Sequence, residues 1–176
     1  MRITVLLFFL TGISWLTADD TVRMAVQRAI PLIEKSAATY IEERSCFSCH
    51  HQALTVMALG QAKLAGFPVQ DKIISAQSKF TLEYFDDRKD RLPKGEGVPG
   101  GSYSAGYALA GLAAAKEPAN ETTQALVQYL LKTQKKDGSW RIRTHRPPLE
   151  DSDFTATALG LKAMAKTDYA RKASQW

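Results

Sequence analysis

A regular repeat constrains the fold of this chain more than any other feature of its sequence. At intervals of 50 residues the chain carries three similar triplets: Ala58-Leu59-Gly60, Ala108-Leu109-Ala110 and Ala158-Leu159-Gly160. Each triplet lies in a segment of small residues with no strand-type alternation, so we expect helices over 52–65, 103–116 and 153–166. Small side chains let neighbouring helices approach closely, and these three helices should therefore form a tightly packed inner layer.

Longer amphipathic segments alternate with the Ala-rich ones. They carry larger and more charged residues, and we expect outer helices over 21–44, 69–88 and 121–135. Pro31 lies inside the first of these and is expected to kink it or divide it in two. The sequence therefore predicts an all-α fold of about three α/α helical hairpins with a period of 50 residues, arranged as a solenoid or as part of a ring.

A short motif at the third junction carries a family resemblance. Gln134, Gly138 and Trp140 match Gln-x-x-x-Gly-x-Trp, which resembles the QW motif of the squalene cyclase and prenyltransferase repeat superfamily. The resemblance implies an α/α toroid in which the Gln caps an outer helix and packs against the Trp. It implies a repeat domain over 19–176 that is truncated at its C-terminus, a partial ring whose open edge favours self-association. An ordinary helix C-cap at Gly138 followed by a buried Trp is the alternative.

The run Asp-Ser-Asp-Phe-Thr-Ala over 151–156 resembles the Asp-x-Asp-Asp-Thr-Ala motif of squalene-hopene cyclases. The resemblance makes Asp153 a candidate catalytic acid with Asp151 as its carboxylate partner, although Phe154 replaces the third Asp. The alternative is that Asp153 caps the third inner helix. Tyr103, Tyr107 and Phe154 are the few aromatic residues suited to line a cyclase cavity, so we expect no active cyclase.

The two cysteines of the chain and two of its three histidines lie within 45–51. Cys46-x-x-Cys49-His50 is the attachment pattern of c-type haem. Both thiols at this spacing can bind haem vinyl groups, and the adjacent imidazole becomes the proximal ligand of the iron. The sequence therefore predicts one covalent haem c, held by Cys46 and Cys49 with His50 on the iron, and His51 as a solvent-side neighbour.

Other readings of the same residues remain open. Cys46 and Cys49 could form a disulfide or an exchangeable dithiol, or be structural. Both thiolates with His50 and His51 could bind zinc, although four ligands within six residues would strain a tetrahedron. The sixth ligand of a haem iron is not specified, and the candidates are Met57 first, then Met24, Met164 and His145.

The N-terminus predicts export. Arg2 precedes an apolar run over 3–10, and Ala18 stands before Asp19 at the expected cleavage position of a signal peptide over 1–18. We expect a periplasmic or secreted protein, with an uncleaved membrane anchor as the alternative. Export is compatible with haem attachment and with a disulfide.

The formal net charge of +5 is spread along the chain without a Lys/Arg cluster, so no nucleic-acid partner is expected. These features together predict an exported haem protein that transfers or senses electrons with a redox partner protein. The alternative function is a toroid domain without haem that binds an isoprenoid, another apolar ligand or a protein partner, with Cys46 and Cys49 in a disulfide.

Overall fold

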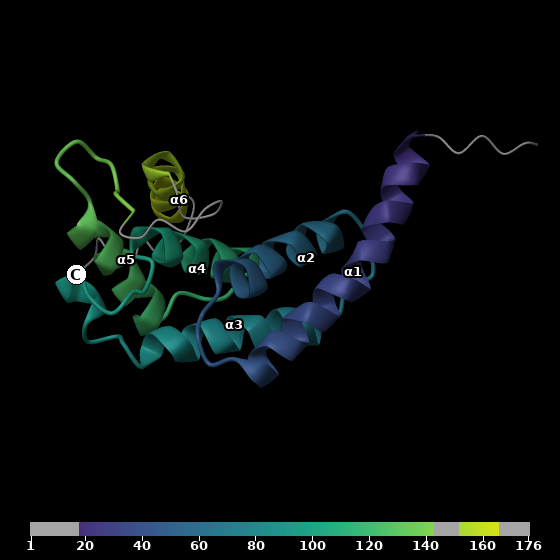
Figure 1. The fold of residues 1–176 in the computed structure, drawn as a ribbon, viewed down its shortest axis with the longest axis horizontal. Helices are drawn as coiled ribbons and strands as arrows, with labels where there is room; N and C mark the ends of the chain where they lie inside the picture. Colours follow the sequence, from purple (N-terminus) through teal and green to yellow (C-terminus); the bar gives the residue numbers. More distant parts are fainter. Residues whose placement is uncertain (1–17, 143–151, 166–176) are drawn as a thin grey trace, which may run out of the picture.

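The computed structural model of the chain describes residues 18–142 and 152–165 (Figure 1). Within these ranges every regular element is helical and there is no strand, which confirms the predicted all-α fold. The elements in order are α1 (Ala18–Glu43), the π-helix η1 (Cys49–Leu54), α2 (Thr55–Leu64), α3 (Asp71–Asp86), the 3₁₀-helix η2 (Leu92–Lys94), α4 (Ser102–Ala114), α5 (Glu121–Thr133) and α6 (Asp153–Ala165).

The helices pack in two rows. In one row α1 contacts α3 and α3 contacts α5, and in the other α2 contacts α4 and α4 contacts α6 (Figure 1). The second row consists of the Ala-rich helices and the first of the more charged ones, as the alternation of segments predicted. α4 is buried along most of its length. Closure of such rows into a ring stays a prediction.

Glycines let α4 approach both of its neighbours in the Ala-rich row. A Cβ atom added to Gly111 would stand 2.9 Å from the Cα of Ala53 in η1, and one added to Gly106 would stand 2.9 Å from the Cβ of Leu159 in α6. These separations are below van der Waals contact. The small residues of this helix therefore determine how closely the row packs.

Helix α1 runs without interruption through Pro31, so the segment is not divided in two, and a kink at Pro31 stays a prediction. Pro31 lies on the exposed side of the helix. The carboxylate of Glu34 on the buried side accepts hydrogen bonds from the backbone N–H (2.7 Å) and the side-chain amide (2.6 Å) of Gln70, just before α3. Packing against α3 thus holds α1 together and offsets the one backbone hydrogen bond that a proline removes.

The core of the described residues lies among α3, α4, α5 and α6. Its largest side chains are almost fully buried: Trp140, Tyr103, Tyr129 and Phe85. Burying each such aromatic side chain contributes roughly 2–3 kcal/mol relative to exposure. None of the helices in the described ranges has the length and apolarity needed to cross a bilayer.

Candidate functional site

The two cysteines lie where the chain turns from α1 into η1, and they face different surroundings. Cys46 is exposed in the loop, whereas Cys49 is the first residue of η1 and is only 8% exposed. The Sγ atom of Cys49 lies 3.7 Å from the Oγ atom of Ser104 on α4. Both residues are thiols in this structure. Cys46 is thus accessible to solvent, whereas the sulfur of Cys49 faces the core.

Ser48 begins the helix that carries Cys49 and both histidines. Its hydroxyl accepts a hydrogen bond from the backbone N–H of His51, which satisfies one donor of the first turn. Its own backbone N–H donates to the Oε1 atom of Gln52 at 2.6 Å. The first turn is a π-helix, a widened turn that is often found at functional sites.

A chain of buried amides anchors this turn to the outer helices. Gln52 and Gln77 are fully buried. The side-chain amide of Gln52 donates to the Oε1 atom of Gln77 at 3.3 Å, and that of Gln77 donates to the backbone carbonyl of Ala37 at 3.0 Å. Neither glutamine was predicted as part of the site. The available signal was a glutamine at a position that faces inward in each of two helices.

Tyr40 on α1 covers the loop from the other side. Its hydroxyl donates to the backbone carbonyl of Cys46 at 3.2 Å and also lies 3.2 Å from the Sγ atom of Cys46. Burial and the hydrogen bond to Cys46 raise the pKa of Tyr40 to about 12. The hydroxyl therefore keeps its proton at neutral pH and acts as a hydrogen-bond donor.

The two histidines have different environments. The ring of His51 stacks on Tyr40, with 4.2 Å between centroids and 18° between planes, and its Nδ1 atom lies 3.3 Å from the Oγ atom of Ser48. Burial, and then the charge of His50, lowers the pKa of His51. His50 is exposed, with its ring 4.5 Å from that of His51. His51, expected as a solvent-side neighbour, is half-buried, because Tyr40 covers one face of its ring.

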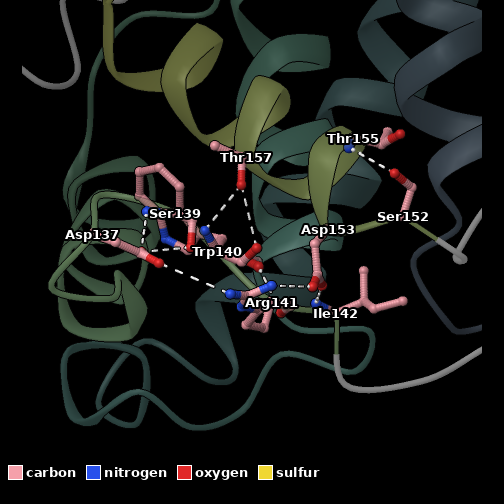
Figure 2. A network of polar contacts seen from close by, with 10 residues as sticks. Asp137, Ser139, Trp140, Arg141, Ile142, Ser152, Asp153, Thr155 and Thr157 are labelled. Atoms are coloured by element: carbon pink, nitrogen blue, oxygen red, sulfur yellow. Dashed lines mark hydrogen bonds and ion pairs between the residues drawn. The ribbon is translucent and has the colours of Figure 1, made fainter.

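The QW residues lie at the junction between α5 and α6, where Figure 2 shows Trp140 beside Thr157 of α6. Gln134 ends α5 as its C-cap, and its amide donates to the carbonyl of Gly138 at 3.0 Å. The indole N–H of Trp140 donates to the carbonyl of Leu130 at 2.8 Å, and the Trp140 ring is fully buried. The backbone N–H of Trp140 donates to the hydroxyl of Thr157 on α6. The motif thus ties one hairpin to the next.

Asp153, the candidate catalytic acid, has a structural role here. One carboxylate oxygen accepts from Arg141 at 2.7 Å and the other from the backbone N–H of Ile142 at 2.8 Å (Figure 2). Each oxygen thus accepts a hydrogen bond from the loop that precedes α6, and Asp153 also lines the hollow beside Phe154. Asp153 is also not the cap of α6, because Ser152 accepts the backbone N–H of Thr155. Asp151 lies outside the described residues.

Of the aromatic residues expected to line a cavity, Tyr103 and Tyr107 lie together on α4 with 4.8 Å between ring centroids, and Phe154 lies on α6. Tyr103 is buried in the core, whereas Phe154 is 89% exposed on α6. An apolar hollow of about 440 Å³ lies beside Phe154, Ala158 and Leu161, open at the surface. Tyr103 and Tyr107 do not line this hollow. The interaction of this face with an apolar ligand or with another copy of the chain stays a prediction.

No protein-family model matches this chain. No curated protein and no solved structure matches it either.

The residues at the start of η1 have the chemistry that covalent haem requires, but not all of them are accessible to a haem in the folded protein. Two thiols and an imidazole are the donors that haem c requires, and Cys46 and His50 are exposed. Cys49 has to turn away from Ser104 before its sulfur is accessible. Among the described residues, no three His, Cys, Asp or Glu side chains are grouped so that they could hold a metal ion directly.

The candidates for a sixth iron ligand are scattered. Met57 is half-buried in α2, in the same continuous helical run as His50 and about 10 Å further along its axis. Two residues of one helix at this spacing do not face each other across a planar ring. Met24 is exposed on α1, Met164 packs against the core, and His145 lies outside the described residues. The identity of a sixth ligand stays unassigned.

Proposed function

We propose that this chain is an exported protein that holds one covalent haem c through Cys46 and Cys49, with His50 as iron ligand, and transfers or senses electrons. The observation that carries the proposal is the setting of the motif. Cys46 and His50 are exposed on a turn whose backbone is anchored by Ser48 and Gln52. The scaffold, in this proposal, is a partial α/α toroid of the squalene cyclase-like kind, and it serves no cyclase chemistry.

The residues around the motif have distinct tasks in this proposal. The buried amides of Gln52 and Gln77 keep the turn in place, and Tyr40 holds the loop that carries Cys46. A bound haem supplies a one-electron redox couple whose potential depends on its ligands and its exposure to solvent. A site at the end of α1 and at the surface leaves one side open to a redox partner protein.

The inward position of Cys49 adds a requirement. Its thiol is covered by α4, so a group as large as haem reaches it only when the contact between Cys49 and Ser104 is open. Covalent attachment is therefore expected before η1 packs against α4, or after local unfolding of this turn. The folded thiol protein should be a poor acceptor of haem.

An absorption spectrum and an intact mass test the proposal. The full chain is expressed with residues 1–18 in a host that matures c-type cytochromes. The proposal predicts a Soret band, a mass increase of one haem, and loss of covalent haem in a variant with Cys46→Ser and Cys49→Ser. Ser104→Ala is the matched control, because it alters the neighbour of Cys49 and leaves the attachment residues intact. A colourless wild-type protein without added mass contradicts the proposal.

A second function is favoured by the unequal exposure of the two cysteines. An exposed Cys46 and a buried Cys49 at a helix start form the arrangement in which one thiol attacks a disulfide and the other resolves it. In such exchange the two thiols lose two hydrogens to form the Cys46–Cys49 bond, and a small-molecule or protein disulfide gains them as two thiols. A colourless protein lighter by two hydrogen atoms would support this second function.

A further inference from the structure

We propose that Tyr40 is a positioning residue that withholds His51 from the iron, so that His50 alone is offered as the ligand. This inference rests on the proposed haem function, because the motif contains two adjacent imidazoles and only one can be the proximal ligand. In the sequence, only the position of His50 directly after Cys49 favours it over His51 as the ligand. The structure adds a physical reason for this choice. That cause lies on α1, outside the motif.

The contacts of His51 occupy much of its ring. Tyr40 covers one face at a centroid distance of 4.2 Å, and the Nδ1 atom is engaged with the hydroxyl of Ser48 at 3.3 Å. To turn toward a haem at the cysteines, the ring of His51 would have to leave the face of Tyr40. The contact of Nδ1 with Ser48 does not by itself prevent binding, because a ligating histidine normally keeps a hydrogen bond at its second ring nitrogen. His50 is exposed, and its printed ring contact is with His51 itself, at 4.5 Å between centroids and 52° between planes. The arrangement therefore favours His50, because its ring is exposed and is not stacked on Tyr40.

Tyr40 is itself well placed to act as a fixed support. It lies three residues after Ala37, which is nearly fully buried and whose carbonyl accepts from Gln77. Its hydroxyl donates to the carbonyl of Cys46, so the same side chain holds the first cysteine of the motif and the second histidine. One residue thus sets the position of both ends of the motif relative to α1.

Two replacements of Tyr40 separate the effect of its hydroxyl from that of its stacked ring. Tyr40→Phe removes the hydroxyl and keeps the stacking face, whereas Tyr40→Ala removes both. If stacking withholds His51, only the alanine variant releases it. Tyr107→Phe is a matched control, because Tyr107 is a half-buried tyrosine on α4 for which the described residues show no hydrogen bond of the hydroxyl.

The haem-loaded protein gives the first measurement. His50→Ala should lose the spectrum of an iron with a proximal imidazole, and His50→Ala with Tyr40→Ala should regain it through the released His51. His50→Ala combined with Tyr40→Phe or Tyr107→Phe should not regain it, and adding His51→Ala to the rescued variant should abolish the rescue. If His50→Ala alone keeps an imidazole ligand from His51, or if Tyr40→Ala brings no rescue, the proposal is overturned.

The haem-free protein gives an independent measurement by nuclear magnetic resonance of its histidine rings. The ring current of Tyr40 should shift the His51 ring protons upfield, and this shift should persist in Tyr40→Phe and Tyr107→Phe and disappear in Tyr40→Ala. An unchanged His51 signal in Tyr40→Ala overturns the positioning role, whatever the haem result. A wild-type protein that takes up no haem overturns the proposed function and the choice of ligand, while the ring shifts still decide whether Tyr40 positions His51.

Discussion

The side-chain amide of Gln52 donates a hydrogen bond of 3.3 Å to the amide oxygen of Gln77, and both side chains are fully buried. The pair joins the turn that carries the cysteine motif to α3, and through the carbonyl of Ala37 to α1. Buried polar groups are costly unless their hydrogen bonds are complete. This relationship makes the position of the motif sensitive to residues that are distant from it in sequence.

Gln77→Leu should therefore destabilise the protein and loosen the motif. The substitution leaves the amide of Gln52 and the carbonyl of Ala37 without this partner, at a cost of about 1–3 kcal/mol. Urea unfolding measures the loss of free energy, and hydrogen exchange of the Ser48 amide should become faster. Gln61→Leu, the same change at an exposed position of α2, is the control and should be nearly neutral. Equal stability of the two variants would argue against a structural role of the amides.

The two thiols should react at different rates in the folded haem-free protein. Cys46 is exposed and Cys49 is 8% exposed, so iodoacetamide should modify Cys46 at least ~10-fold faster. Peptide mass spectrometry after short reaction times measures the ratio. In concentrated urea the rates should converge, which serves as the control. Similar rates in the folded protein would contradict the inward orientation of Cys49.

Gly111→Ala should destabilise the protein although alanine favours helices. The new Cβ atom would stand 2.9 Å from the Cα of Ala53, so the backbones of α4 and η1 would have to separate. Overpacking of this kind costs roughly 1–3 kcal/mol, which exceeds the gain in helix propensity of about 1 kcal/mol. Gly60→Ala is the comparison, since its Cβ would meet the carbonyl oxygen of Ala114 at 3.3 Å and requires a smaller adjustment. Thermal unfolding of both variants should rank Gly111→Ala as the less stable.

Trp140→Phe should cost more stability than Gln134→Ala. The phenylalanine leaves a cavity and deprives the carbonyl of Leu130 of its donor, for a loss of about 2–3 kcal/mol. Gln134 is half-buried and its amide contributes one hydrogen bond to the carbonyl of Gly138, for which about 1 kcal/mol is expected. Urea unfolding of the two variants measures both losses of unfolding free energy. The reverse order would show that the glutamine is the stabilising part of the motif.

The contribution of Asp86 to the stability of the folded protein should depend on pH. Hydrogen bonds from Thr122 and then from Lys89 lower the pKa of Asp86 below its usual 3.8, so the folded state favours the carboxylate. The stabilisation is present above pH 3.8 and is lost as the pH falls through the lower pKa of the folded state. Asp86→Asn should lower the Tm at pH 7 and have no effect in stronger acid. Asp87→Asn, at the exposed neighbouring position, is the control, and an equal effect of Asp86→Asn at both pH values would contradict the assignment.

Much of the helical architecture was predictable from local patterns. The Ala-rich and amphipathic segments correctly indicated six helices within the described residues, and the small residues correctly indicated close approach in the row of α2, α4 and α6. Gln134 was correctly expected to cap an outer helix, and Trp140 to be buried. These features depend on residues that are near each other in sequence, whose spacing determines which side of a helix they occupy.

The predictions that failed depended on contacts between distant elements. Pro31 did not divide α1, because packing against α3 supports the helix on its buried side. Asp153 did not cap α6, because Ser152 takes that place while Arg141 and the backbone of Ile142 bind the carboxylate. In both cases a partner supplied by tertiary packing outweighed the local preference of the residue.

For the candidate site, the pattern of residues predicts Cys46, Cys49 and His50 as the haem-binding group, and this stays a prediction. The pattern did not show that Cys49 faces Ser104, that Tyr40 covers His51, or that Gln52 and Gln77 form a buried pair. Each of these contacts joins different helices, and their geometry follows from how α1, α3 and α4 enclose η1. Spacing along a chain specifies which groups are available, whereas burial and orientation arise only when the helices that surround them have packed.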